Sequence, residues 1–110
     1  MSTNSTVGII GVGAMGEALV SGLLAVGWDP SDISLCVRRK ERAEELGRRS
    51  GCDVFFHPGE AIEGRQLVVV AVKPRDVAGV LEDLQGRVVA GQTVLSLAAA
   101  FCFALGITLP

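Results

Sequence analysis

The sequence predicts an α/β fold with a doubly wound parallel sheet, strand order 3-2-1-4-5, and helices on both faces of the sheet. Three features of the 110-residue chain lead to this prediction: a glycine-rich turn between an apolar strand and a helix, strand-like runs that alternate with helical patterns, and a continuous β-branched run within 67–72. Alternating strands and helices imply right-handed crossovers and therefore a parallel sheet. In such a sheet the ligand is expected where the strand order reverses, between the first and fourth strands.

The first strand is expected at Val7–Ile10, and it is followed by the sequence Gly-Val-Gly-Ala-Met-Gly at 11–16 and then by helical periodicity. In a strand–turn–helix unit, Gly11 allows the tight turn, Gly13 lets backbone N–H groups approach a pyrophosphate, and Gly16 lets helix and strand pack closely. The anion is then held at the positive end of the helix. This favours a Rossmann-like dinucleotide-binding domain over 7–110, after a disordered lead-in at 1–6. A purely structural glycine turn is the alternative, because glycine supplies 14 of the 110 residues.

The other elements follow from the hydrophobic period and from the turn residues between apolar runs. Continuous apolar runs are typical of parallel strands that are covered on both faces. Further strands are expected at 33–37, 53–56, 67–72 and 93–97. Helices are expected at 17–26, 38–49 and 58–62 and after Pro74, with Gly27 and Ser50-Gly51 ending the first two.

Two of the predicted helices differ in how much apolar surface they present. Ala43 and Leu46 form a narrow apolar stripe in 38–49, so this helix is expected to be mostly solvated. In the helix after Pro74 the apolar residues recur at i, i+3, i+4 and i+7, which predicts a broader face toward the sheet. The residues of that face are Val77, Val80, Leu81 and Leu84.

Basic residues follow the second predicted strand, about 20 residues beyond the glycine turn, where this fold contacts the adenosine ribose. An acid there suits the 2′-hydroxyl of NAD, whereas arginine suits the 2′-phosphate of NADP. Arg38, Arg39, Lys40 and Arg42 occupy this stretch, and no acid stands at Val37. Cations at a helix start oppose its macrodipole, and an arriving phosphate would relieve that conflict. The stretch therefore favours NADP(H) over NAD, with a solvated helix start as the alternative.

Composition excludes several other classes of protein. Ten Lys and Arg against twelve acids give a net charge of −2, which argues against a nucleic-acid surface. Cys36, Cys52 and Cys102 have no CxxC spacing, so we expect reduced thiols in a cytoplasmic protein. His57 is the only histidine and is interpreted as a surface residue, so we expect no metal site. The N-terminus lacks the features of a secretory signal. The uncharged stretch 88–110 is long enough for a membrane span, but polar residues interrupt it, so we interpret it as the fifth strand and an apolar terminus.

Four motifs together resemble pyrroline-5-carboxylate reductase. They are Gly-Val-Gly-Ala-Met-Gly-Glu-Ala-Leu at 11–19, the arginine directly after the second strand, Ala71-Val72-Lys73-Pro74 and Leu95-Ser96-Leu97-Ala98-Ala99. The resemblance covers about 7–99, which is the cofactor half of a full-length member. This chain departs from the family at Val37, where many members have a polar residue, at Ala100, where they usually have glycine, and in the apolar sequence that follows.

The resemblance implies an NADP-dependent oxidoreductase that transfers a hydride to 1-pyrroline-5-carboxylate, a small-molecule substrate, and gives proline. It implies cofactor contacts from Gly11, Gly13, Ala14, Met15, Gly16, Arg38, Arg39, Ala71, Val72, Lys73, Pro74 and Ala98, and no catalytic residue within this chain. Members dimerise and complete their site through a C-terminal helical domain, which this sequence does not contain. A homo-oligomer is therefore implied for full-length members. The alternatives are a protein similar to the F420-dependent NADP oxidoreductases and a non-catalytic NADP-binding module.

Overall fold

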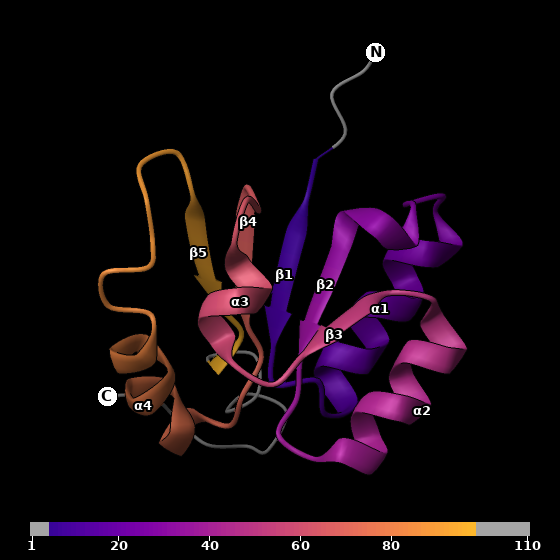
Figure 1. The fold of residues 1–110 in the computed structure, drawn as a ribbon, viewed down its shortest axis with the longest axis horizontal. Helices are drawn as coiled ribbons and strands as arrows, with labels where there is room; N and C mark the ends of the chain where they lie inside the picture. Colours follow the sequence, from indigo (N-terminus) through magenta and orange to yellow (C-terminus); the bar gives the residue numbers. More distant parts are fainter. Residues whose placement is uncertain (1–4, 99–110) are drawn as a thin grey trace.

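The computed structural model describes residues 5–98, which form a five-stranded parallel sheet with the order β3-β2-β1-β4-β5. This confirms the predicted topology. All strands run toward one edge of the sheet, where the arrowheads in Figure 1 point. The strands are β1 (Val7–Ile10), β2 (Ile33–Cys36), β3 (Asp53–Phe55), β4 (Leu67–Val70) and β5 (Thr93–Ser96).

Helices cover both faces of the sheet, as predicted. The helices are α1 (Ala14–Ala25), α2 (Lys40–Ser50), α3 (Pro58–Ile62) and α4 (Pro74–Asp83), with a short 3₁₀ turn, η1 (Pro30–Asp32), before β2. Residues of α1 and α2 share one apolar cluster with the sheet, and residues of α3 and α4 share a second cluster with its other face. Accordingly, α2 and α4 lie on opposite sides of the sheet in Figure 1.

The central strands are buried because helices cover them on both sides. β1 and β2 are buried along their whole length, and so are the last three residues of β4. α2 is mostly solvated, as the sequence predicted: Ala43 and Leu46 are its buried residues, and its other residues are exposed or half-buried. The first cluster is built around Ile9, Ile33, Leu35 and Val69, and the second around Ala61, Ile62, Val68 and Val70.

The predicted helix face after Pro74 is correct in part. Val80 and Leu84 are buried and Val77 is half-buried, but Leu81 is 47% exposed. The prediction for Leu81 was wrong because α4 contacts the sheet through a stripe narrower than its apolar periodicity. β5 is also exposed at all four residues, because it lies at the edge of the sheet and pairs only with β4 among the described residues.

Several elements have different bounds from those predicted. β2 ends at Cys36 and β4 at Val70, one and two residues earlier than expected, because the chain leaves the ladder to cross toward the following helix. The helix expected at 38–49 starts at Lys40, so Arg38 and Arg39 precede it. By contrast, α1 begins at Ala14, three residues earlier than the predicted start at 17, so the glycine turn leads directly into the first helical turn.

Hydrogen bonds to the sheet begin before Val7. Thr6, expected in the disordered lead-in, accepts the Leu67 amide at its carbonyl and the Gln66 amide at its hydroxyl, so it is held beside β4. The other residues of the predicted lead-in, apart from Ser5, lie outside the described residues, as do Ala99, Cys102 and the rest of the apolar terminus. Within 5–98, no helix combines the length and the apolar character that crossing a bilayer requires.

Candidate cofactor-binding cleft

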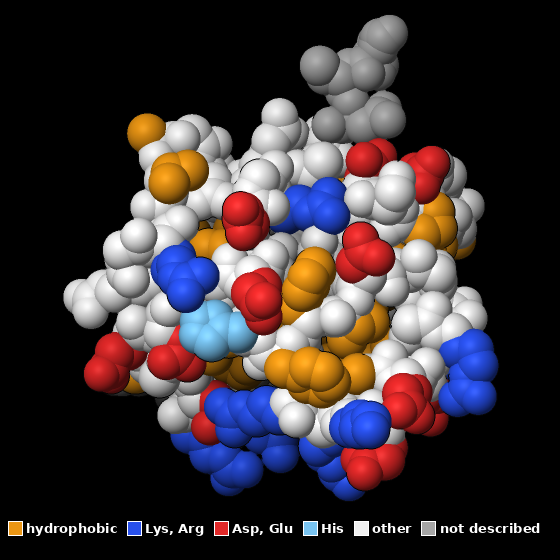
Figure 2. Space-filling model, in the orientation of Figure 1, with side chains coloured by type: hydrophobic (Ala, Val, Ile, Leu, Met, Phe, Trp, Pro, Cys, Tyr) orange, Lys and Arg blue, Asp and Glu red, His pale blue; other side chains and the backbone are white. Residues whose placement is uncertain are grey.

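A cleft of about 990 Å³ opens at the carboxyl edge of the sheet, where β1 and β4 lie side by side and the strand order reverses. Its walls come from the glycine turn, the β2–α2 connection, the residues after β3, and the β4–α4 connection. Figure 2 shows Lys and Arg side chains gathered along this lower edge of the molecule. The volume is at the upper end of the range of small-molecule sites, which is enough for a nucleotide cofactor.

The glycine turn positions free backbone donors at the mouth of this cleft. Gly11 has φ +82°, a conformation that favours glycine, and a Cβ at this position would collide with Val72 after β4. Both the backbone conformation and the close approach of Val72 therefore require glycine here. Gly13 has an ordinary φ of −94° and no atom within 4 Å of the position of a Cβ, so nothing within the described protein requires glycine there. The first turn of α1 leaves its N–H groups without intrahelical partners, and Ala14 and Met15 line the cleft. The open side of Gly13 therefore leads to unpaired donors at a positive helix end.

The two arginines that precede α2 belong to another wall of the cleft, the β2–α2 connection. Arg38 and Arg39 both line the cleft and are exposed, and neither forms an ion pair within 5–98. The adjacent Val37 is buried, and its amide donates to the Phe55 carbonyl at 3.0 Å, which fixes the strand end from which the arginines emerge. The cleft thus combines the backbone N–H groups at the start of α1 with two arginines that form no ion pair within the described residues.

Arg42, the fourth cation of the same run, is in a different situation. Its Nη2 donates to Glu17 Oε2 at 2.6 Å and to the Val12 carbonyl at 3.4 Å, and its Nη1 donates to Glu45 Oε1 at 2.8 Å. Glu17 and Glu45 also bind Arg49. The hydrogen bond from Arg42 is the largest cause that lowers the pKa of Glu17 below its ordinary value of 4.5.

The cleft also contains apolar and acidic groups. Cys36 lines its floor at the end of β2, and burial raises the pKa of this thiol to about 11, so the sulfur is a protonated, apolar contact and not a nucleophile. Phe56, directly after β3, is 56% exposed and offers an aromatic ring at the same edge. Acids line the cleft as well: Glu41, Glu45, Asp76 and Asp83.

The structure brings together most of the residues that the sequence assigned to the cofactor. Those that line the cleft are Gly11, Gly13, Ala14, Met15, Arg38, Arg39, Ala71, Val72 and Lys73. Gly16, Pro74 and Ala98 do not line it. Gly16 is buried in α1, where a Cβ would stand 3.2 Å from the Gly11 carbonyl oxygen, and Pro74 is the first residue of α4. Ala98 follows β5 and is half-buried.

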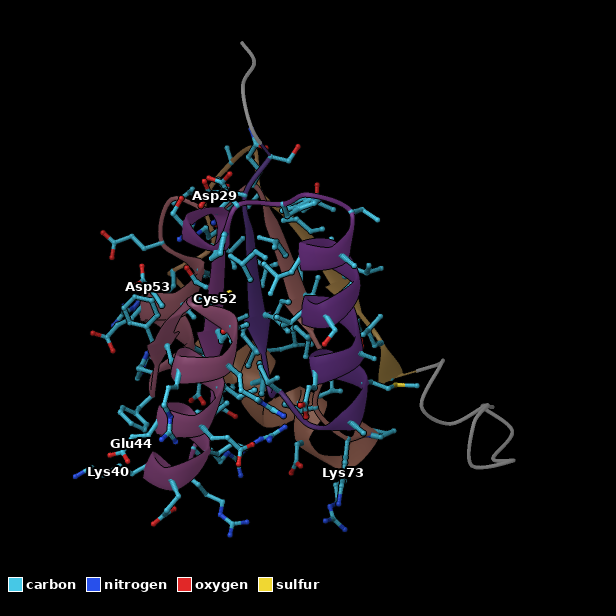
Figure 3. All side chains as sticks on the ribbon, turned by 90° about the vertical axis from the view of Figure 1, so that its right-hand side faces the viewer. Asp29, Lys40, Glu44, Cys52, Asp53 and Lys73 are labelled. Atoms are coloured by element: carbon cyan, nitrogen blue, oxygen red, sulfur yellow. The ribbon has the colours of Figure 1, made fainter. Side chains whose placement is uncertain are left out.

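Other features of the site were not found from the sequence. Phe56 was placed inside a strand, although an aromatic residue at the carboxyl end of a strand is a signal that could have identified it. Arg75 lines the cleft beside Lys73, which extends from the lower edge in Figure 3. His57 also lines the cleft, and its Nδ1 accepts the Gly59 amide at 3.0 Å, so it caps α3. Within the described chain, no cluster of three or more His, Cys, Asp or Glu residues could hold a metal ion.

Comparison with known proteins agrees with this geometry. The family described as "NADP oxidoreductase coenzyme F420-dependent" matches residues 6–100, which is nearly the whole chain. The chain belongs to this family. The parallel sheet, the glycine turn and the cleft at the switch point all fall within the matched residues.

The chain is similar to pyrroline-5-carboxylate reductases and to a reductive aminase. The pyrroline-5-carboxylate reductase of Corynebacterium melassecola is 35% identical over 103 residues, which are 91% of this chain and 38% of that protein. A solved structure of the Coxiella burnetii pyrroline-5-carboxylate reductase superimposes with a TM-score of 0.79 at 28% identity, covering 86% of this chain and 35% of that one. A reductive aminase from Aspergillus terreus in complex with NADPH and ethyl-5-oxohexanoate gives a TM-score of 0.65 at 26% identity, over 86% and 32% of the two chains. The resemblance to pyrroline-5-carboxylate reductase is thereby confirmed, and the chain spans about a third of the length of such relatives.

Proposed function

We propose that this chain is the NADPH-binding part of a pyrroline-5-carboxylate reductase, an enzyme of proline biosynthesis. The observation that carries the proposal is the pairing, in one cleft, of the glycine turn with two uncommitted arginines, Arg38 and Arg39. A dinucleotide with a 2′-phosphate needs both groups, because its pyrophosphate and its 2′-phosphate are separate anions. The relatives named above supply the substrate class.

The residues present fit this cofactor. The empty space beside Gly13 allows close approach to the unpaired amides of Ala14 and Met15, and a side chain at this position would fill that space. Arg38 and Arg39 offer planar guanidinium groups, which match phosphate oxygens in a bidentate manner. Ala71, Val72 and Lys73 continue the wall toward β4, where the nicotinamide half is proposed to lie, with Pro74 and Ala98 behind it.

When bound, the cofactor supplies a hydride to the C=N carbon of the substrate. The residues of this chain bind and orient it: the turn amides hold the pyrophosphate, and the arginines hold the 2′-phosphate. The apolar wall of Ala71 and Val72 excludes water from one side of the reacting ring. The substrate carboxylate and the dimer contacts are assigned to the helical domain of full-length members, and we propose that the protein acts in the cytoplasm, since the described cysteines, Cys36 and Cys52, are free thiols.

A second candidate is an F420-dependent NADP oxidoreductase, which the description of the matched family favours. Both candidates use the same nucleotide site, so the nucleotide does not distinguish them. Turnover of 1-pyrroline-5-carboxylate by a full-length protein that contains this chain would support the first candidate. Turnover of F420 instead would support the second, and nucleotide binding without either turnover would support a binding module.

The first test is a thermal-shift titration of the chain with NADPH and with NADH. At about 100 times its dissociation constant, a ligand adds roughly 2.7 kcal/mol to the free energy of unfolding. For a domain of this size, that corresponds to an increase of roughly 10 °C in Tm. We expect NADPH to give this increase at a concentration well below that needed for NADH.

The role of the arginines is tested with the double variant Arg38→Ala/Arg39→Ala. Hydrogen bonds to charged groups contribute about 1.5–3 kcal/mol, so the affinity for NADPH should fall about 10- to 100-fold while that for NADH changes little. The matched control is Arg48→Ala, which removes an exposed arginine of α2 outside the cleft. Equal losses for both nucleotides would contradict the assignment of the 2′-phosphate to Arg38 and Arg39.

A further inference from the structure

We infer that Arg42 is a positioning residue for the cofactor pyrophosphate. Arg42 holds the glycine turn against α2 and neutralises the carboxylate of Glu17 beside that turn. This inference rests on the proposed function and assigns to Arg42 a role distinct from that of the neighbouring Arg38 and Arg39. It concerns the half of the cofactor that NADPH and NADH share, and not the 2′-phosphate that distinguishes them.

The contacts of Arg42 join the two helix starts that border the cleft. From the first turn of α2, its guanidinium reaches the Val12 carbonyl, inside the glycine turn, and the Glu17 carboxylate, in the first turn of α1. Glu17 has its own amide bonded to the Gly13 carbonyl at 2.8 Å. Arg42 thus contacts the turn directly through Val12 and indirectly through Glu17. Its removal would take away one side-chain contact on each side of Gly13, at Val12 and at Glu17, while the backbone hydrogen bonds of the turn remain.

Three hydrogen bonds engage the side chain of Arg42, whereas the side chains of Arg38 and Arg39 donate none within residues 5–98. Nη1 serves Glu45, and Nη2 serves Glu17 and Val12. Its side chain is 29% exposed and lies between two carboxylates, so its charge is balanced inside the protein. Both donors of Nη2 and one of Nη1 are engaged, so a phosphate would have to use the remaining N–H groups or displace a carboxylate. Arg42 also lines the cleft, and we assign its effect on the cofactor to its contacts with the turn.

Glu17 explains why the cation is needed at this place. A carboxylate in the first turn of a helix interacts favourably with the helix dipole, and here it competes with a pyrophosphate for the same positive helix end. Arg42 and Arg49 both bind Glu17, but Arg49 is 55% exposed and is shared with Glu45 at 3.3 Å. Without Arg42, Glu17 would keep only this solvated partner, and its negative charge would then oppose the arriving pyrophosphate.

The test compares dissociation constants of NADPH and NADH for the wild-type chain, Arg42→Ala, Arg42→Lys and the double variant Arg42→Ala/Glu17→Gln. All are measured by isothermal titration calorimetry at a temperature where circular dichroism shows each variant folded. We expect Arg42→Ala to weaken both nucleotides by the same factor, about tenfold, and Arg42→Lys to weaken them less. The double variant should regain most of the lost affinity, because the opposing carboxylate is gone. Arg48→Ala, on the same helix and exposed, is the control and should bind both nucleotides as the wild type does.

Three results would overturn the inference. Selective loss of NADPH in Arg42→Ala would make Arg42 a ligand of the 2′-phosphate. Unchanged dissociation constants with a lowered Tm would reduce it to a tie between α1 and α2, and failure of Glu17→Gln to restore affinity would remove the electrostatic argument. A wild-type chain that binds neither nucleotide would overturn the proposed function itself, and the inference with it.

Discussion

Two glycines of the same turn should respond to alanine in opposite ways. Gly13 has a φ that alanine adopts without strain and no neighbour within 4 Å of a Cβ, so Gly13→Ala should stabilise the cofactor-free chain by about 0.4–1 kcal/mol through the unfolded state. Its Tm should rise by roughly 2–5 °C. Gly11→Ala places a side chain at φ +82° against Val72. The left-handed conformation costs roughly 1–2 kcal/mol and overpacking a further 1–3, so this variant should lose about 2–5 kcal/mol.

Gly13→Ala should weaken cofactor binding although it stabilises the fold. The new methyl group fills the space through which a pyrophosphate would approach the amides of Ala14 and Met15, so the affinity for NADPH should fall at least about tenfold, or 1.4 kcal/mol. The measurements are urea denaturation for stability and calorimetric titration for binding. A Gly13→Ala chain that is more stable and binds NADPH within about twofold of the wild type would refute the close-approach argument.

Further predictions concern charge, a thiol and the core. The hydrogen bond from Arg42 lowers the pKa of Glu17, so the Glu17 carboxylate stabilises the fold above pH 4.5, and this contribution is lost as the pH falls through the lowered pKa. Glu17→Gln should therefore flatten this part of a Tm profile recorded from about pH 6 to about pH 3, and an unchanged profile would contradict the argument. Burial raises the pKa of Cys36 to about 11, so iodoacetamide at about pH 8 should label this thiol roughly 100-fold more slowly than a free cysteine. Peptide mass spectrometry follows the labelling, and denaturant should abolish the difference. Val80→Ala should cost about 1–3 kcal/mol in urea denaturation, whereas Leu81→Ala should stay within about 0.5 kcal/mol; similar costs would mean that α4 buries the broader face.

The sequence was sufficient for the topology because local and periodic signals agree along this chain. β-branched runs, helix-ending glycines and the glycine turn each identify one element, and the alternation of strands and helices then leaves few possible sheet orders. Gly27 and Gly51 have positive φ and end α1 and α2 as the sequence indicated. Element ends were less accurate, because hydrogen bonds in the sheet, and not side-chain type, decide where a strand stops.

The errors arise where a side chain's role depends on what lies opposite it. Leu81 has the period of a buried residue, but burial also requires a surface for it to cover, and within residues 5–98 no element covers it on α4. Arg42 belongs to the same cationic run as Arg38, and only the folded chain shows that Glu17, far away in the sequence, occupies one of them and not the other. For the same reason, the sequence indicated the cations of the β2–α2 connection but not the ion pairs that join Arg42 to Glu17 and Glu45.

The central position of β1 has a consequence for the order of events during synthesis. β1 leaves the ribosome first among the strands, but its partners are β2 and β4, and Val7 pairs with Leu67. At 5–20 residues per second, a ribosome needs on the order of 3–12 s to make the roughly 60 residues between these partners. During that interval the glycine turn exists without the wall that Val72 provides. A nucleotide therefore has no complete site to bind until β4 has joined the sheet, so it can stabilise the finished domain but cannot guide its early assembly.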